Sequence, residues 1–327
     1  MQNKITLLGP IPYDHITTLN NQQIDRYGCL TYPTIALSRL LGRKSRITPV
    51  AHVRKRDRQT IKTILKGLPG VELLHINSDM DQGDVMVLKY IEKDRCLEKQ
   101  YGFMNPIMPD DVKHLLDSDY FLCMPVTDYE ISIDTLHFIK NNSESSVIFN
   151  AHGVTMAMTS LGDRVNKFWV DRDLYLPYID ILVLSHEQVK YSWFAKEFSL
   201  KQLENSDDLT EEEQLEFVTH CFNYGVKAIY ITLGDEGSLV YFSENGEVKS
   251  EFIESIALPT NPEDTTGKNE SFIAGLTFGL IRTKNDYVKA ARYGNVIATQ
   301  RTRGISYNVF DSLEKTSYIV REAYGED

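Results

Sequence analysis

The sequence predicts a three-layer α/β/α protein with a mainly parallel central sheet and a small β lid. Short, almost wholly apolar runs indicate strands at Ile5–Leu8, Thr48–His52, Glu72–Ile76, Tyr120–Met124, Val147–Asn150, Asp180–Leu184 and Ala228–Leu233. Segments with helical spacing lie between many of them, at Arg58–Lys66, Ile131–Lys140, Leu209–Tyr224 and Asp286–Arg301. Strands that are apolar on both faces and alternate with helices indicate a parallel sheet covered on both sides.

The lid is predicted from two stretches that break this rhythm, at about residues 12–30 and 84–104. Asp14–Leu30 is polar and irregular, and Val85–Tyr101 alternates in segments too polar for central strands. In an α/β core such excursions often cover the ligand crevice, although a surface hairpin without a role remains the alternative. With neither repeat nor linker visible, we expect one domain over residues 1–327.

A hairpin is predicted near the start of the last third of the chain. The alternating runs Leu239–Phe242 and Val248–Ile253 flank the dipeptide Asn245-Gly246. Asn-Gly between alternating runs is the strongest short-range hairpin signal, because both residues tolerate a positive φ.

Composition restricts the function. The chain has 327 residues, 42% of them hydrophobic, and a net charge of −11, which argues against a nucleic-acid-binding protein. No apolar run is long enough to cross a bilayer, so no membrane partner is expected. Four scattered cysteines without a CxxC pair fit a cytoplasmic protein with free thiols. No histidine spacing suggests zinc.

The segment Asp264–Phe272 carries the clearest chemical signal. A polar, glycine-containing turn runs into an apolar helix, and such a helix N-terminus suits a phosphate or a developing anion. Glu270, in the first helical turn, is a candidate general base. From the residues alone a simple capped helix start explains the same pattern, with Asp264 or Thr265 as the cap.

A resemblance to a known family favours the chemical interpretation. Asp264–Gly275 resembles the DTxGAGDxFxxG signature of the ribokinase-like (PfkB) carbohydrate kinases. Three further segments resemble family motifs in the right order, and so does a downstream helix. They are Leu7–His15 (first strand and sugar-binding aspartate), Gly28–Gly42 (the GG…N…A…LG segment), Ile231–Ser238 (the TxGxxG loop) and Ala290–Asn295. The least favoured alternative is a generic α/β protein whose motifs match by chance, because four motifs match in order.

The resemblance implies ATP- and Mg²⁺-dependent phosphoryl transfer to a hydroxyl of a sugar or nucleoside-like molecule. It assigns catalysis to Glu270, Gly267, Lys268 and Asn269, and substrate binding to Asp14, Gly28, Cys29 and Pro33. Nucleotide binding falls to Thr232, Gly234, Gly237, Thr265 and Asn295, and a weak metal site to Glu187 and Gln188. The acceptor stays open, and a homodimer through the lid is a further arrangement that the family implies.

Several family positions are altered, which leaves two interpretations. GAGD reads Gly267-Lys268-Asn269-Glu270, and NxxE reads Ser185-His186-Glu187-Gln188. The chain is either a working kinase with Glu270 as its base, or an impaired relative that serves as a nucleotide- or sugar-binding or regulatory module. His152, at the end of a predicted strand, could contact a phosphate or be an ordinary loop residue.

Overall fold

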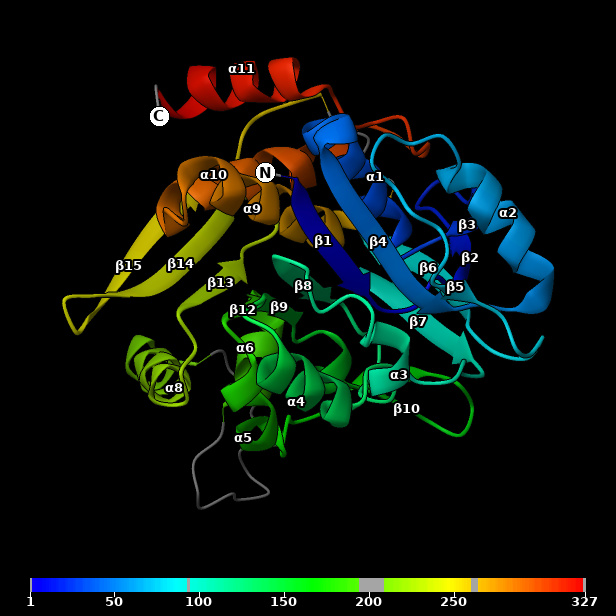
Figure 1. Cartoon of the computed structure of the whole chain (residues 1–327), viewed down its shortest axis with the longest axis horizontal. Coiled ribbons are helices and arrows are strands. Elements are labelled where there is room, and N and C mark those ends of the chain that lie inside the picture. The colour runs from blue at the N-terminus through cyan, green and yellow to red at the C-terminus, as the bar shows by residue number, and fades with distance from the viewer. Residues whose placement is uncertain (1, 93–94, 194–208, 260–263, 326–327) are drawn as a thin grey trace.

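A nine-stranded sheet forms the centre of the molecule in the computed structural model, which describes residues 2–92, 95–193, 209–259 and 264–325 (Figure 1). Its strand order is β15-β14-β13-β12-β9-β8-β1-β4-β5, parallel from β13 through β5 and antiparallel at β13-β14-β15. The strands are β1 (Asn3–Leu8), β4 (Ser45–His52), β5 (Ile76–Asn77), β8 (Tyr120–Cys123), β9 (Ser146–Asn150), β12 (Ile181–Ser185), β13 (Ala228–Thr232), β14 (Gly237–Glu244) and β15 (Glu247–Glu254).

Helices cover both faces of this sheet, because the side chains of the strands alternate between two apolar cores. In β1, Ile5 and Leu7 join one core, and Leu8 joins the other. The first face carries α1 (Thr31–Leu41), α2 (Lys55–Leu65), α9 (Lys268–Thr283), α10 (Tyr287–Arg301) and α11 (Leu313–Tyr324). The other carries α3 (Pro109–Val112), α4 (Ile133–Asn142), α5 (Arg172–Tyr175), α6 (His186–Ser192) and α8 (Glu211–Asn223) (Figure 1).

A separate four-stranded sheet lies beside the main one, in the order β3-β2-β6-β7 (Figure 1). Its strands are β2 (Tyr13–Thr17), β3 (Gln23–Tyr27), β6 (Val85–Glu92) and β7 (Arg95–Tyr101). They fall within the two stretches predicted as the lid, of which residues 93 and 94 lie outside the described part. We call this unit the small sheet; its role as a lid, and a single-domain organisation, stay proposals.

The predicted fold class is confirmed, with one strand in error. The layers and the parallel core are as expected, and Asn245 and Gly246 have φ of 53° and 82°, as the Asn-Gly hairpin requires. The run Glu72–Ile76 is wrong as a strand, because only Ile76 and Asn77 pair with β4. Before them Val71 makes one isolated bridge to Ile47, so this outer edge of the sheet is short.

The topology places a crevice at the carboxyl ends of the parallel strands. After β1 the chain first adds β4 and β5 on one side, and later adds β8 and β9 on the other. Ligands of open α/β sheets bind where the strand order reverses in this way. In the described part of the chain, no helix is long and apolar enough to span a membrane.

Candidate active site

A cleft of about 860 Å³ lies at this crevice, between the main sheet and the small sheet. Ser185 and Thr232 line it from the ends of β12 and β13. Tyr90 and Glu98 line it from β6 and β7 of the small sheet. Eleven of the residues that the sequence predicts for the site also line it: Asp14, Cys29, Glu187, Gln188, Thr232, Gly234, Thr265, Gly267, Lys268, Asn269 and Glu270.

The turn that begins α9 has the geometry of an anion site. Gly267 is the N-cap with φ of 86°, and a Cβ there would meet the Tyr32 ring at 2.3 Å, so only glycine fits. The first intrahelical bond runs from the Ser271 amide to the Gly267 carbonyl. The amides of Asn269 and Glu270 precede this bond, at the positive end of the helix dipole.

Two buried arginines hold the start of this turn. Asp264 Oδ2 lies 2.5 Å from Arg26 Nη2 and 3.0 Å from Arg301 Nη2, and all three residues are buried. Burial raises the pKa of Asp264, but Arg301 and Arg26 outweigh it, so the pKa lies below its usual value. Arg301 also lies over the Tyr32 ring, 4.5 Å from its centroid. The turn is therefore anchored to both α10 and the small sheet.

A second link joins the small sheet to the same turn. The Tyr90 hydroxyl lies 2.9 Å from Thr266 Oγ1 and 3.3 Å from Thr265 Oγ1, and it accepts a bond from the Thr265 amide. Tyr90 is on β6, which pairs with β2 and so with the strand of Asp14. Movement of the small sheet therefore changes the hydrogen bonds of the turn.

Glu270 and Asp14 bring two carboxyl groups to the cleft. Burial raises the pKa of Glu270, and the Glu98 carboxylate adds to the effect. Burial raises the pKa of Asp14 well above its usual value; Arg26 opposes this and Glu270 adds to it. Both groups line the same cleft, and a carboxylate with a raised pKa is a stronger base.

The other predicted substrate residues differ in position. A Cβ on Gly28 would lie 2.1 Å from Asp14 Oδ2, so glycine gives this carboxylate its space. Cys29 lines the cleft, but its thiol donates to the Met124 carbonyl and burial raises its pKa. Pro33 is buried inside α1 and does not line the cleft.

The predicted nucleotide residues are divided between the cleft and a second, smaller cavity of about 20 Å³. Thr232 and Gly234 line both, whereas Gly237 and Asn295 line only the smaller one. The Asn295 amide donates to the Ile253 carbonyl at 2.9 Å and to the Glu254 carbonyl at 3.4 Å. Lys268 Nζ lies 2.7 Å from Asp235 Oδ1, which ties the catalytic turn to the loop after β13.

The predicted metal residues are engaged elsewhere. The Gln188 carbonyl oxygen accepts from the Ser185 amide at 2.8 Å, and its amide nitrogen lies 2.8 Å from His152 Nδ1. Glu187 accepts from the Asn166 amide. In the described ranges, no three His, Cys, Asp or Glu side chains group together as a metal site. A Mg²⁺ here would rest chiefly on the phosphates of a donor and on water.

Sequence reasoning missed Tyr90 and Arg164, both of which line the cleft. Arg164 donates to Glu98, Gln100 and the Val126 carbonyl, and its Nη2 lies 3.1 Å from His152 Nε2. Burial and Arg164 lower the pKa of His152 to about 4, so this histidine is neutral near pH 7 and supplies no charge for a phosphate. Only the folded arrangement brings these residues together.

Comparison with known families gives one match. Residues 147–306 match the model described as pfkB family carbohydrate kinase. No curated protein matches the chain.

Many solved structures share the fold. One is a ribokinase of Arabidopsis thaliana complexed with ribose and ATP, at 16% identity and TM-score 0.71, covering 98% of this chain and 99% of that chain. A nucleoside kinase of Burkholderia thailandensis complexed with inosine has 14% identity and TM-score 0.71, covering 99% of each chain. A pyrophosphate-dependent kinase in the ribokinase family, complexed with a pyrophosphate analog and myo-inositol, has 14% identity and TM-score 0.70, covering 96% of this chain and 99% of that chain.

Proposed function

We propose, on the premise that this chain is a divergent ribokinase-like (pfkB) protein, that it transfers a phosphoryl group to a hydroxyl of a sugar or similar small molecule. The carrying observation is the meeting of Glu270, Asp14 and the N-terminus of α9 in one cleft. These groups supply the base, the hydroxyl ligand and the anion site that phosphoryl transfer requires.

The residues divide the work as follows. Asp14 accepts hydrogen bonds from hydroxyls of the acceptor and fixes its orientation. Glu270 takes the proton of the attacking hydroxyl, for which its raised pKa suits it. The amides of Asn269 and Glu270 and the helix dipole stabilise the negative charge that develops on the transferring phosphoryl group. The small sheet, docked through Tyr90, keeps water from the reacting phosphate.

The donor is a phosphoanhydride. The sequence predicts ATP with Mg²⁺, and the Arabidopsis neighbour is complexed with ATP. Another neighbour is pyrophosphate-dependent, so the fold accepts either kind of donor. Mg²⁺ would neutralise donor phosphate charge; the engaged side chains of Glu187 and Gln188 fit it poorly as direct ligands. Ribose, inosine and myo-inositol in the neighbours define the acceptor classes to test.

One observation favours the alternative, an impaired relative that binds ligands without turnover. The position of the family's metal-organising glutamate is occupied by Gln188, whose side chain is committed to Ser185 and His152. An enzyme that lost this charge without compensation would retain the cleft and lose the reaction.

Mass spectrometry of acceptor phosphorylation separates the two. Purified protein with Mg²⁺ and either ATP or pyrophosphate is incubated with ribose, inosine, myo-inositol and related polyols. A phosphorylated acceptor that forms only with active protein supports the proposed kinase. Measurable acceptor binding with no product from any donor contradicts it and favours the binding module.

A further inference from the structure

Four residues lie between the cleft and the smaller cavity, on the side where a phosphoryl donor is expected to bind. Thr232, Gly234, Lys268 and Asn269 line both the cleft of about 860 Å³ and the cavity of about 20 Å³ beyond. The smaller cavity therefore continues the donor side past the catalytic turn. The family resemblance assigns nucleotide binding to residues on this side.

The smaller cavity is closed by its own walls. Asn295 from α10 is hydrogen-bonded to the backbone of β15, and Ser255 Oγ lies 3.3 Å from Thr299 Oγ1. A Cβ on Gly237 would meet the Ile253 carbonyl at 2.1 Å, so β14 and β15 leave no space here. A volume of about 20 Å³ holds roughly one water molecule. A purine base with its ribose needs several times more.

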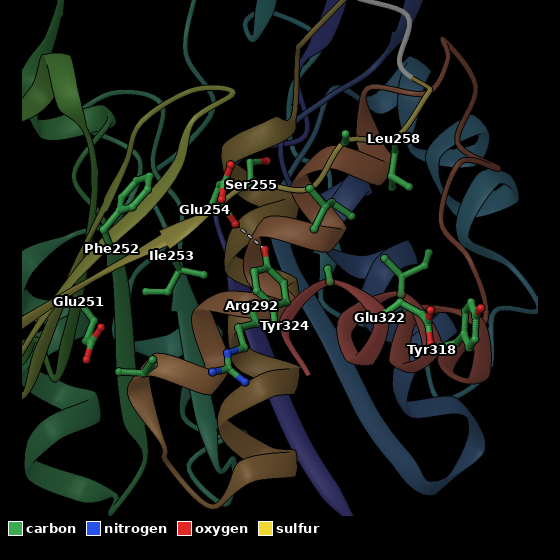
Figure 2. Close-up of a pocket in the computed structure, with 15 residues that line it drawn as sticks. Glu251, Phe252, Ile253, Glu254, Ser255, Leu258, Arg292, Tyr318, Glu322 and Tyr324 are labelled. Carbon is green, nitrogen blue, oxygen red and sulfur yellow. Dashed lines mark hydrogen bonds between the residues drawn. The ribbon is translucent and has the colours of Figure 1, made fainter. Parts of the chain in front are cut away.

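The wall is also held from behind. Ser255 lines both the small cavity and a hollow of about 630 Å³ on the outer side, between β15, α10 and α11. There the Tyr324 hydroxyl donates to the Glu254 carbonyl at 2.6 Å, the dashed line in Figure 2. Arg292 lies over the Tyr324 ring, 5.7 Å from its centroid. Opening the small cavity would require these contacts to break.

A charged pair lies at the four shared residues. Lys268 Nζ and Asp235 Oδ1 are 2.7 Å apart, and the Lys268 side chain is only 15% exposed. An ammonium has three donor hydrogens, so Lys268 can keep Asp235 and still bind a phosphate in the cleft. Lys268 thus places a positive charge beside the helix N-terminus, at a position that lines both the cleft and the smaller cavity.

We infer that the phosphoryl donor is inorganic pyrophosphate and that Lys268, paired with Asp235, is the residue that sets this specificity. The inference rests on the proposed function. The acceptor oxygen bonds to one phosphorus, the bond from that phosphorus to the bridging oxygen breaks, and inorganic phosphate leaves. Glu270 takes the hydroxyl proton. Lys268 and the amides of Asn269 and Glu270 bind the two phosphates, and in the described part of the chain the cavity beyond Lys268 is too small for a nucleoside.

Kinetics with both donors test this inference. With Mg²⁺ and a productive acceptor, kcat/KM for pyrophosphate is expected to exceed that for ATP on the order of 100-fold. Equal or better use of ATP overturns the donor inference and leaves the kinase intact. If neither donor gives product, the proposed function fails, and the donor inference, which rests on it, fails as well.

Lys268→Gln tests the role of the lysine. It removes the charge but keeps most of the side-chain length, and the KM for pyrophosphate is expected to rise by about tenfold or more, the effect of one charged hydrogen bond. Lys284→Gln, at the exposed C-terminal end of the same helix, is the matched control and should leave KM unchanged. An unchanged KM in Lys268→Gln overturns the role assigned to Lys268.

Discussion

Tyr90 of the small sheet and Thr266 of the catalytic turn share a hydrogen bond of 2.9 Å between their side-chain oxygens. The two residues are 176 positions apart in the chain, so the contact joins two parts of the site that are distant in the sequence. It makes the small sheet a direct support of the turn that carries Glu270.

Tyr90→Phe should reduce activity while the fold persists. The ring still packs in the small core of the second sheet, but the bonds to Thr265 and Thr266 are lost. We expect kcat to fall by about fivefold, since the loss of a hydrogen bond of about 1 kcal/mol acts on the turn. Tyr101→Phe, on the half-exposed edge of β7, is the control. An unchanged kcat in Tyr90→Phe would show that the small sheet does not support catalysis through this hydroxyl.

Arg301→Met should be strongly destabilising. Asp264 would keep Arg26 but lose the second of its two buried partners. Removing one partner of a buried pair costs about 3–5 kcal/mol, which urea unfolding measures directly. Asp264→Asn should also be strongly destabilising, because it leaves both buried arginines without their carboxylate partner. Arg43→Met, at an exposed position, is the control. Equal stability of Arg301→Met and Arg43→Met would contradict the anchoring of Asp264 by the buried arginines.

Glu130 gives a prediction for pH. Glu130 and Asp84 are buried, and Glu130 Oε1 and Asp84 Oδ1 lack a hydrogen-bond partner among the described residues. Burial raises the pKa of Glu130 from 4.5 to about 7, and burial and Glu130 raise that of Asp84. The folded protein therefore holds a proton more tightly than the unfolded chain. The contribution of Glu130 to stability is therefore fully present below pH 4.5 and is lost as the pH rises through about 7.

Glu130→Gln should flatten this decline. The amide stays neutral, and its oxygen can still accept from the Val126 and Thr127 amides. Urea unfolding at pH 5 and pH 8 should give a smaller stability difference for the variant than for the wild type. The exposed Glu144→Gln serves as the control. An identical pH dependence of the wild type and Glu130→Gln would refute the claim that the buried Glu130 carboxyl group causes this decline.

Asp14→Asn should act on acceptor binding. The amide keeps the size of the side chain beside Gly28 but loses two strong acceptor sites. We expect the KM for the acceptor to rise by about tenfold or more, the usual effect of a charged hydrogen bond, with a smaller change in the KM for the donor. Steady-state kinetics with each substrate varied in turn make the comparison. A larger effect on the donor would place Asp14 on the wrong side of the cleft.

The sequence predicts the fold well because its signals are local. A few neighbouring residues are enough to predict the conformation of apolar runs such as Ile229–Ile231 and of the Asn245-Gly246 turn. The prediction extends the edge strand too far before Ile76, because Leu73 and Leu74 have the apolar character of strand residues. In the structure Leu74 is 79% exposed. Local apolar character alone does not tell whether a neighbouring strand is present to pair.

The site was predictable where a residue acts through its own local backbone. Gly267 and Glu270 belong to one helix start, so their proximity follows from the sequence. Arg26, Tyr90 and Arg301 reach the same turn from three distant elements, and no local pattern marks them. The closure of the small cavity also depends on side-chain volumes from α9 and α10, which only the packed structure supplies.

The most direct test of the central claim compares wild type with Glu270→Gln in acceptor-dependent phosphoryl transfer. The product is followed by mass spectrometry with pyrophosphate or ATP, and Glu314→Gln on α11 is the control. Loss of the general base should reduce kcat by about 10²–10⁴-fold, with ligand binding retained and the control unaffected. Product formation by Glu270→Gln at the wild-type rate would contradict the claim that this cleft catalyses phosphoryl transfer with Glu270 as its base.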